Sequence, residues 1–519
     1  MTADPAVVTL IHTVSDSPLY TRIRTLLEAL ETGLFERTTA VRVSFLAAVA
    51  GESVFFLGPP GVAKSLIARR IKHAFAESQS FEYLMGRFST PEEIFGPISL
   101  KRLKEADSYE RLTERYLPEA DVVFLDEIWK ASPPIQNALL TALNERLFRN
   151  GAREIHIPLK LVVAASNEVP DTHLEQAAFW DRFLLRIVLE PIGSRDSFRR
   201  LIADDHDPYT DPVPAPLKIS NDEYREWSRG VSEVAIPEPI GDLLWAVAAS
   251  IRAHEELSDV SDRRWKKIAR LLRASAFLHG RSEVSVTDCG VIVHAIWDDP
   301  TVRGSVEEVL SGALAEYDHG WNADLLALKG ELERAETELT SSVTEETVAE
   351  VDVPRLYRGE YYRLLDHPFD GSVLIWKSDF ERLDEAEAMP CDLFYYTEDD
   401  QYSHTESIFV RREDTAVETP DGLFAIEVER RTERVVEQRG TSEDEMRHHH
   451  RHADRLRSAV ARILAEASDY RQILSDEAEH HLFLSPAARH AILAGIDRVL
   501  ERAGEMELSV RRHAERVAG

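Results

Sequence analysis

The chain has 519 residues, of which 92 are Asp or Glu and 61 are Lys or Arg, so its formal net charge is -31. This length predicts about three or four domains, each large enough to bury a hydrophobic core. The acidic charge argues against nucleic-acid partners, because tight binding to a phosphate backbone needs clustered Lys and Arg.

The cysteine count and the hydropathy pattern argue against two further classes of protein, those stabilised by disulfides and those that are exported or span a membrane. Cys289 and Cys391 are the only cysteines and lie outside any C-x-x-C motif, which argues against a disulfide framework and favours a reducing cytoplasm. The first residues lack a basic segment followed by a long apolar one, and no window approaches 18 uninterrupted apolar residues. We therefore expect neither an export signal nor a membrane span, and a cytoplasmic location.

The first 205 residues predict an α/β domain. Residues 20–50 have apolar positions at helical spacing, interrupted at Gly33. Short apolar runs follow and alternate with helical patterns, which favours a parallel sheet with helices on both faces; these runs are 53–58, 121–127, 159–167 and 184–191.

The remainder of the chain changes character several times. The stretch 204–218 is rich in Pro and Asp and reads as a linker. From this linker onward the sequence predicts four segments. They are an α-helical domain over 206–300 with a helix stop at Gly280, a helical segment over 301–346, a β-rich module over 347–431, and further helices over 432–519. We expect the helices on either side of the module to pack together, so that the module is an insertion into a helical bundle.

Residues 58–65, "GPPGVAKS", nearly match the phosphate-binding loop G-x-x-x-x-G-K-[ST]. In such a loop backbone N–H groups surround phosphate oxygens at a helix N-terminus, while Lys64 reaches the β- and γ-phosphates and Ser65 binds Mg²⁺. Ala63 stands at the second glycine position, where an alanine can be tolerated if its φ is negative. The predicted nucleotide contacts of this segment are Gly58, Gly61, Val62, Ala63, Lys64, Ser65 and Leu66.

Polar residues end two of the predicted strands, where ligands of parallel sheets bind. Asp126 is placed to support Mg²⁺ and Glu127 to polarise the attacking water, in the pattern of a Walker B strand. Asn167 follows the next strand and is placed to hold that water and sense the γ-phosphate. The alternatives are that the carboxylates cap the following helix and that Asn167 is an ordinary turn residue.

Several segments, in this order and spacing, resemble the MoxR group of AAA+ ATPases. They include "FLGPPGVAKSLIARR", "YLPEADVVFLDEIWKASPPIQNALLTALNERLFRNG", "LVVAASNEVPD" and "AFWDRFLLRIVLEPI". Within that group, "VSDRRWKKIARLLRASAFLHGRS" and the segment from Gly33 to Ser65 are similar to the RavA (regulatory ATPase variant A) type. The resemblance covers roughly residues 20 to 300 and includes the alanine before the lysine.

The resemblance assigns roles to further residues. Asn167 matches sensor 1, and Arg182 matches the arginine finger that a neighbouring subunit supplies. Arg263 matches the sensor 2 arginine of an α-helical lid, with Arg264 as the alternative. Phe35 matches a position close to the adenine. Against these roles, an arginine is often simply solvated or ion-paired, and an aromatic residue at helical spacing is often core.

The resemblance also implies ATP and ADP as ligands, Mg²⁺ as the metal, a hexameric ring, and chaperone-like action on a protein client. Residues 86–99 match a helix-2 insert, and residues 147–160 match a β-hairpin that turns at Asn150 and Gly151. Both insertions either face the central pore of the ring or lie on its surface. A protein with a von Willebrand factor A (VWA) domain is the expected co-chaperone. The module over 347–431 occupies the place that docks on lysine decarboxylase in RavA-type proteins, although no residue motif matches.

Two alternatives to a chaperone-like ATPase remain: a chelatase-like or DNA-acting motor of the same group, and a nucleotide-gated scaffold. A separate cluster, "MRHHHRH" over 446–452, places His448 and His452 four residues apart, a spacing that suits a transition metal on a helix. Flanking arginines favour instead a solvated, pH-responsive helix face.

Overall fold

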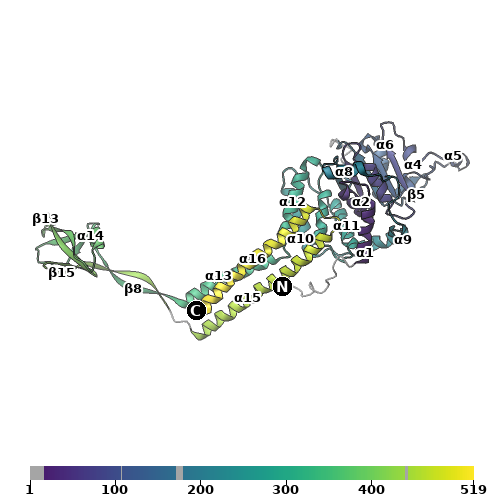
Figure 1. The fold of residues 1–519 in the computed structure, drawn as a ribbon. Helices are drawn as coiled ribbons and strands as arrows, with labels where there is room; N and C mark the ends of the chain where they lie inside the picture. The colour runs from purple at the N-terminus through teal and green to yellow at the C-terminus, as the bar shows by residue number, and fades with distance from the viewer. Residues whose placement is uncertain (1–16, 107, 171–178, 439–441, 519) are drawn as a thin grey trace. The chain divides into compact units, whose positions relative to one another are not determined.

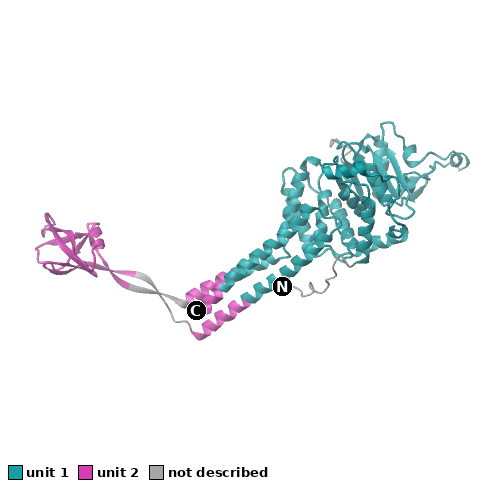
Figure 2. Cartoon of the chain, in the orientation of Figure 1, with its two compact units in different colours: residues 1–329, 456–511 teal, residues 330–455, 512–519 magenta. Residues whose placement is uncertain are grey.

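The computed structural model describes residues 17–106, 108–170, 179–438 and 442–518. The first sixteen residues, in which we expect no export signal, lie outside this range. The described chain forms two compact units, residues 1–329 with 456–511 and residues 330–455 with 512–519 (Figure 2). None of its described helices combines the length and apolar character needed to cross a membrane.

The first unit begins with a five-stranded parallel sheet in the order β2-β3-β6-β1-β7, with helices on both faces (Figure 1). Three of the four predicted apolar runs form its central strands β1, β3 and β6, because their side chains are buried on both faces, and the fourth forms the edge strand β7. The strands are β1 (Ser53–Leu57), β2 (Ser80–Leu84), β3 (Val122–Asp126), β6 (Leu161–Ser166) and β7 (Leu185–Val188). The α/β fold class is thereby confirmed, and β2 is an additional edge strand.

Seven described helices accompany this sheet: α1 (Pro18–Glu31), α2 (Thr38–Ala50), α3 (Lys64–Lys72), α4 (Pro91–Phe95), α5 (Leu100–Ala106), α6 (Pro133–Glu145) and α8 (Arg195–Ala203). The predicted hairpin is β4 (Leu147–Asn150) with β5 (Arg153–His156). Because Asn150 pairs with Arg153, the two-residue turn is Gly151 and Ala152, one position later than predicted.

The predicted α-helical domain follows as α9 (Asn221–Glu233), α10 (Glu238–Ala253), α11 (Asp262–Leu278) and the 3₁₀ helix η6 (Val286–His294). α11 stops at Gly280, whose φ of 73° suits a residue without Cβ. The next helical segment is two helices, α12 (Arg303–Glu316) and α13 (Trp321–Val343), separated at Gly320 with its φ of 86°.

Two long helices end the chain, α15 (Glu443–His480) and α16 (Pro486–Ala518), and α13, α15 and α16 contribute residues to both units. In the first unit Arg471 of α15 bonds Asp497 of α16 at 2.8 Å, and Arg502 of α16 donates to Asn322 of α13 at 2.9 Å. The helices before and after the module therefore pack together, as expected.

The second unit contains the β-rich module. Seven antiparallel strands form its sheet around a separate core, with one short helix, α14 (Lys377–Arg382). They are β9 (Leu356–Tyr357), β10 (Tyr361–Leu364), β11 (Ser372–Trp376), β12 (Met389–Tyr396), β13 (Tyr402–Glu413), β14 (Ala416–Thr419) and β15 (Gly422–Ala425). A two-stranded ribbon, β8 (Thr344–Pro354) with β16 (Val428–Gln438), leads into and out of it. The final helical stretch therefore starts at Glu443 and not near residue 432.

Candidate functional site

The loop between β1 and α3 contains two glycines, and each is required for a different physical reason. A Cβ on Gly58 would lie 2.2 Å from the Leu189 carbonyl oxygen, so the backbone of β1 approaches its neighbour too closely for any side chain. Gly61 has a φ of 85°, and a Cβ there would meet nothing within 4 Å. The first glycine is required by packing, and the second by the left-handed turn of a loop that faces open space.

The φ of Ala63 is not negative, so the condition under which an alanine is easily tolerated at this position is not met. Its φ is 70° and its ψ 23°, the left-handed conformation, at the N-cap of α3. The chain turns from the loop into the helix at this residue, and a Cβ there costs roughly 1 to 2 kcal/mol. Ala63 therefore adopts the conformation that a glycine would adopt without strain.

Lys64 opens α3, and its side chain is folded back over the loop. Its exposed fraction is 8%, and Nζ donates to the Gly58 carbonyl oxygen at 2.6 Å. Ser65 and Leu66 follow, half-buried, in the first helical turn, where backbone N–H groups have no intrahelical acceptor. A buried cation and a helix N-terminus thus meet at one loop, an arrangement that favours phosphate.

Asp126 and Glu127 lie at the carboxyl end of β3. Glu127 has a left-handed backbone, with a φ of 51°, and its N–H donates to Asp126 Oδ1 at 3.0 Å. Burial raises the pKa of Asp126, while that hydrogen bond and the nearby Lys64 oppose the rise. The Glu127 carboxylate lies 3.5 Å from Lys130 Nζ. The two carboxylates therefore differ in partners, although they are adjacent in sequence.

Asn167 follows β6, the strand between β3 and β1, and is exposed. The Gly58 N–H donates to the carbonyl of Ser166, the residue before it, at 3.1 Å. Because β1, β3 and β6 are parallel, their carboxyl ends meet at one edge of the sheet. Lys64, Asp126, Glu127 and Asn167 are accordingly brought to the same edge.

Arg37 is a contact of this loop that the sequence analysis misses. It is buried, and its guanidinium donates to the carbonyls of Val62 at 3.0 Å and Glu190 at 2.7 Å. It thereby ties the phosphate loop to the chain after β7. Nothing in the local sequence distinguishes Arg37 from any other arginine at a helix start.

The two residues before Arg37 contact α8. Phe35 is half-buried, with the Arg200 guanidinium 4.9 Å from its ring centroid. The Glu36 carboxylate accepts from the N–H groups of Gly193 at 2.8 Å and Ser194 at 3.0 Å, and these bonds lower its pKa to about 2. The segment expected to approach adenine is therefore anchored to the N-terminus of α8.

Arg182 lies at the opposite edge of the sheet, shortly before β7. Its carbonyl accepts from Ser53 Oγ at 2.6 Å, and Ser53 is the first residue of β1. The two ends of a five-residue strand are about 13 Å apart. Arg182 and the phosphate loop of the same chain are thus on opposite edges.

Arg263 and Arg264, at the start of α11, lie near that same edge. Arg263 is exposed and lines a cavity together with Ser53. Arg264 is buried and donates to the carbonyls of Phe183 at 3.0 Å and Leu184 at 2.7 Å. Of the two, Arg263 has the accessible side chain, while Arg264 anchors α11 to the segment that carries Arg182.

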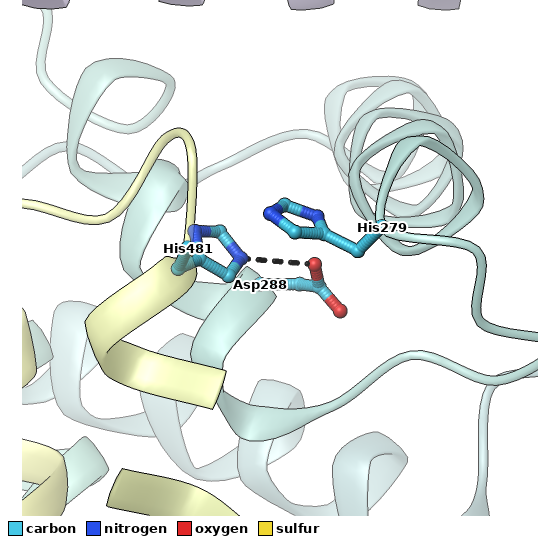
Figure 3. Close-up of side chains that lie close together, drawn as sticks. All are labelled: His279, Asp288 and His481. Atoms are coloured by element: carbon cyan, nitrogen blue, oxygen red, sulfur yellow. Dashed lines mark hydrogen bonds and ion pairs between the residues drawn. The ribbon is translucent and has the colours of Figure 1, made fainter. Parts of the chain in front are cut away.

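A buried trio, His279, Asp288 and His481, has the spacing of a metal site, with one ligand atom from each within 4.8 Å (Figure 3). His279 Nδ1 donates to the Ser275 carbonyl at 2.7 Å, and its Nε2 accepts from the Leu482 N–H at 3.0 Å. Both nitrogens are therefore engaged, and the ring is neutral.

His481 is engaged in the same way. Its Nδ1 accepts from the Phe483 N–H at 3.2 Å, and its Nε2 donates to Asp288 Oδ1 at 3.2 Å. Burial alone would raise the pKa of Asp288, but the Arg281 guanidinium at 2.8 Å and His481 lower it well below its usual range. With no ring lone pair left for a metal, the trio is a satisfied network that joins α11 and η6 to the turn between α15 and α16.

The histidine cluster in the second unit is only partly solvated. His448 and His450 are exposed, whereas His449 is 5% exposed and bonds Ser342 Oγ through Nε2 at 3.3 Å. The rings of His448 and His452 are 6.4 Å apart between centroids. The expectation of a solvated face is wrong for His449, because the helix turns that residue toward α13.

Comparison with known proteins gives two family matches. Residues 21–226 match the MoxR domain of the MoxR-vWA-beta-propeller ternary systems, and residues 239–310 match an AAA lid domain. The chain is similar to two uncharacterized proteins of Methanocaldococcus jannaschii. One is 36% identical and covers 54% of this chain and 72% of that protein; the other is 35% identical and covers 53% and 70%. The chain is also similar to a solved structure from Cytophaga hutchinsonii that is 17% identical in sequence. The match covers 56% of this chain and 94% of that chain, with a TM-score of 0.47.

Proposed function

Because the chain belongs to the MoxR-type AAA+ ATPases, we propose that it hydrolyses ATP to ADP and phosphate in a ring of six copies. In this proposal hydrolysis remodels, matures or regulates a protein client in a chaperone-like role. The observation that carries the proposal is the position of Lys64, Asp126 and Glu127 at one edge of the sheet, beside the phosphate loop.

Lys64 and the first N–H groups of α3 bind the β- and γ-phosphates in this proposal. The ammonium already bonds a neutral carbonyl, and exchanging that acceptor for a charged phosphate oxygen strengthens the bond. The hydroxyl of Ser65 and the carboxylate of Asp126 are oxygen donors of the kind that Mg²⁺ prefers, so these residues fit the metal. When bound, the ion neutralises charge on the phosphates.

Glu127 acts on the attacking water. Its carboxylate side chain is 20% exposed, so it is accessible from the open side of the loop. Asn167 positions the water as sensor 1, and Phe35 approaches the adenine. Arg182 comes from a neighbouring copy and stabilises charge on the transferring phosphoryl group, and Arg263, which lies near the same edge of the sheet, assists from that copy as sensor 2.

The substitution Glu127→Gln tests this assignment. The variant should bind ATP with unchanged affinity, because the amide keeps the shape of the side chain, and should lose turnover by at least about 100-fold. Equilibrium titration with a fluorescent ATP analogue and steady-state phosphate release measure the two quantities separately.

Glu168→Gln is the matched control, since Glu168 is exposed two residues after Ser166 and loses the same charge. It should retain full turnover. Undiminished phosphate release by Glu127→Gln would remove Glu127 from the reaction. Comparing the effect of ATP on a client with that of a non-hydrolysable analogue then separates a motor from a nucleotide-gated scaffold.

A VWA-domain protein is the partner that the family description suggests. The module over 347–431 is the docking surface in this proposal, because its sheet exposes large side chains, with Phe409 64% and Tyr402 58% exposed. Replacing residues 355–427 by a short Gly-Ser loop between the paired Pro354 and Val428 should abolish capture of the partner and leave ATP hydrolysis intact. Lysine decarboxylase is the second candidate for the same capture experiment.

A further inference from the structure

A cavity of about 340 Å³ lies at the amino-terminal edge of the five-stranded sheet, away from the phosphate loop. Residues 50–53, which run from the end of α2 to the start of β1 and are called loop 50–53 below, enclose it together with the end of α6, the start of β6 and α11. Among the described residues that line it, one is a carboxylate, Glu52, and five are cationic: Arg146, Lys160, Arg263, Lys267 and Arg270. Such a concentration of cations is unusual in a chain with a net charge of -31.

Carboxylates neutralise two of these cations. Lys267 Nζ lies 2.7 Å from Glu52 Oε2, and Lys160 pairs with Asp121, a neighbour just outside the cavity. Lys160 is 3% exposed and also donates to Asn221 Oδ1 at 2.8 Å. Both lysines are therefore fixed by partners, and their charge is compensated.

The bonds of Arg146 and Arg270 go to neutral acceptors. Arg146 donates to the Gly51 carbonyl, and Arg270 donates to the Ala50 carbonyl at 2.7 Å and to Ser228 Oγ at 3.1 Å. The ion pairs of the described residues give neither guanidinium a carboxylate partner. Two half-buried guanidinium groups from different elements thus converge on loop 50–53 with uncompensated charge.

We propose that this cavity binds a phosphate-class oxyanion, either free phosphate or polyphosphate or the phosphate groups of a nucleotide. Guanidinium groups hold phosphate oxygens through paired N–H bonds, and a partly desolvated cavity strengthens each of these bonds. The volume accommodates such a ligand with bound water. The inference rests on the uncompensated charges of Arg146 and Arg270, beside the Lys267–Glu52 pair, and does not depend on ATP hydrolysis at the phosphate loop.

Binding at this site would connect two parts of the first unit. Arg270 and Lys267 belong to α11, whereas Gly51 and Glu52 precede β1, which leads to the phosphate loop. An oxyanion between them would hold α11 against the start of β1. Occupancy would therefore fix the orientation of the helical domain relative to the sheet.

The test uses the full chain carrying Lys64→Ala, so that phosphate at the predicted loop does not mask binding at the cavity. Pyrophosphate is titrated by calorimetry at constant ionic strength, and we expect saturable binding with a rise in the thermal midpoint. Lys267→Gln removes a cation and leaves Glu52 uncompensated, which should weaken binding at least about tenfold.

Glu52→Gln should change the affinity for pyrophosphate in the opposite direction. Removing the one lining carboxylate should tighten pyrophosphate binding about threefold or more, an effect that a folding defect does not imitate. Arg225→Gln, on the exposed face of α9, is the control and should leave the affinity unchanged. Equal affinities in Lys267→Gln, Glu52→Gln and their Lys64→Ala parent would overturn the proposal.

A second arm distinguishes the two sources of phosphate. If pyrophosphate binds at protein concentrations where the chain is a single copy, the ligand is a free oxyanion. The ATP arm uses the chain with Lys64 intact, so that a neighbouring copy can hold the nucleotide. If Lys267→Gln weakens ATP binding by that chain only where copies associate, the phosphate comes from a neighbouring copy's nucleotide. No saturable pyrophosphate binding by a folded Lys64→Ala protein, together with no effect of Lys267→Gln on ATP binding by the Lys64 chain, would also overturn the proposal.

Discussion

At the scale of single residues, Ala63 combines a typical loop position with an atypical backbone. Its φ of 70°, at the point where the chain enters α3, belongs to the region where a Cβ is unfavourable. The cost is local, and the contacts of the neighbouring Val62 and Lys64 offset it.

Ala63→Gly should therefore raise the stability of the first unit by about 1 kcal/mol, the strain relieved less the added freedom of glycine in the unfolded chain. Calorimetry of the full chain should detect a higher thermal midpoint. Ala68→Gly, in the right-handed interior of the same helix, should lower it by about as much. A lower midpoint for Ala63→Gly would mean that the methyl group makes a stabilising contact.

Arg37 leads to a prediction about affinity. Arg37→Gln removes the bonds to Val62 and Glu190, so the loop loses its connection to the chain after β7. We expect ATP to bind about tenfold more weakly, equivalent to about 1.4 kcal/mol, the net value of one or two hydrogen bonds. Fluorescence titration measures the change, with Arg24→Gln on the exposed face of α1 as the control. An unchanged dissociation constant would assign Arg37 to stability alone.

The site could be predicted from sequence where the residues are local to a motif. Lys64, Asp126 and Glu127 lie at or after the ends of short apolar runs that favour buried strands, and parallel strands bring their ends to one edge. Arg37 could not be predicted, because its acceptors are carbonyls 25 and 153 positions away in sequence. The left-handed backbone of Ala63 could not be predicted either, because residue type alone favours a negative φ.

At the scale of elements, burial decides which strands the sequence reveals. The strands β1, β3 and β6 are continuous apolar runs. The edge strand β2 has one buried residue, Phe81, and therefore carries little apolar signal. The ribbon of β8 and β16 is rich in charged residues. Because its sequence lacks a regular period of apolar residues, the sequence does not indicate that these two segments are paired strands.

The histidines at the junction between α11, η6 and the turn before α16 predict that the stability of the first unit depends on pH. Burial lowers the pKa of His279 well below 6.5 and also lowers that of His481, whose bond to Asp288 opposes the shift. An unfolded chain protonates its histidines below about 6.5, whereas these two stay neutral in the fold. Their contribution is complete above that pH and is lost as the pH falls toward their folded values.

We therefore expect the first unit to lose about 1.4 kcal/mol per pH unit for each such histidine as the pH falls from 6.5. Urea denaturation at several pH values measures the slope. His279→Gln should reduce the slope, while His448→Gln, at an exposed position, should leave it unchanged. Identical slopes for the parent and His279→Gln would exclude this network as the source of the dependence.

At the scale of the whole molecule, the two groups of proposed catalytic residues lie at opposite edges of one sheet. Lys64, Asp126 and Glu127 are at its carboxyl edge, and Arg182 is held at its amino edge by Ser53. The strand between them is fully buried, and its length separates Arg182 from its own loop. With Arg182 in its proposed role as arginine finger, a complete site would take that residue from a second copy, as in the proposed ring.

Mixing two inactive variants tests this requirement. Arg182→Ala keeps an intact loop but lacks the finger, and Lys64→Ala lacks the loop but keeps the finger. Each alone should be inactive, whereas a one-to-one mixture should regain about a quarter of the parent's turnover, because half of the loops are intact and half of their neighbours supply the arginine. Phosphate release measures the recovery, and co-purification of untagged Lys64→Ala chains with affinity-tagged Arg182→Ala chains confirms that the variants mix. Recovery should vanish when both substitutions are placed in the same chain, and an Arg182→Ala protein that is fully active alone would show that the finger is another residue.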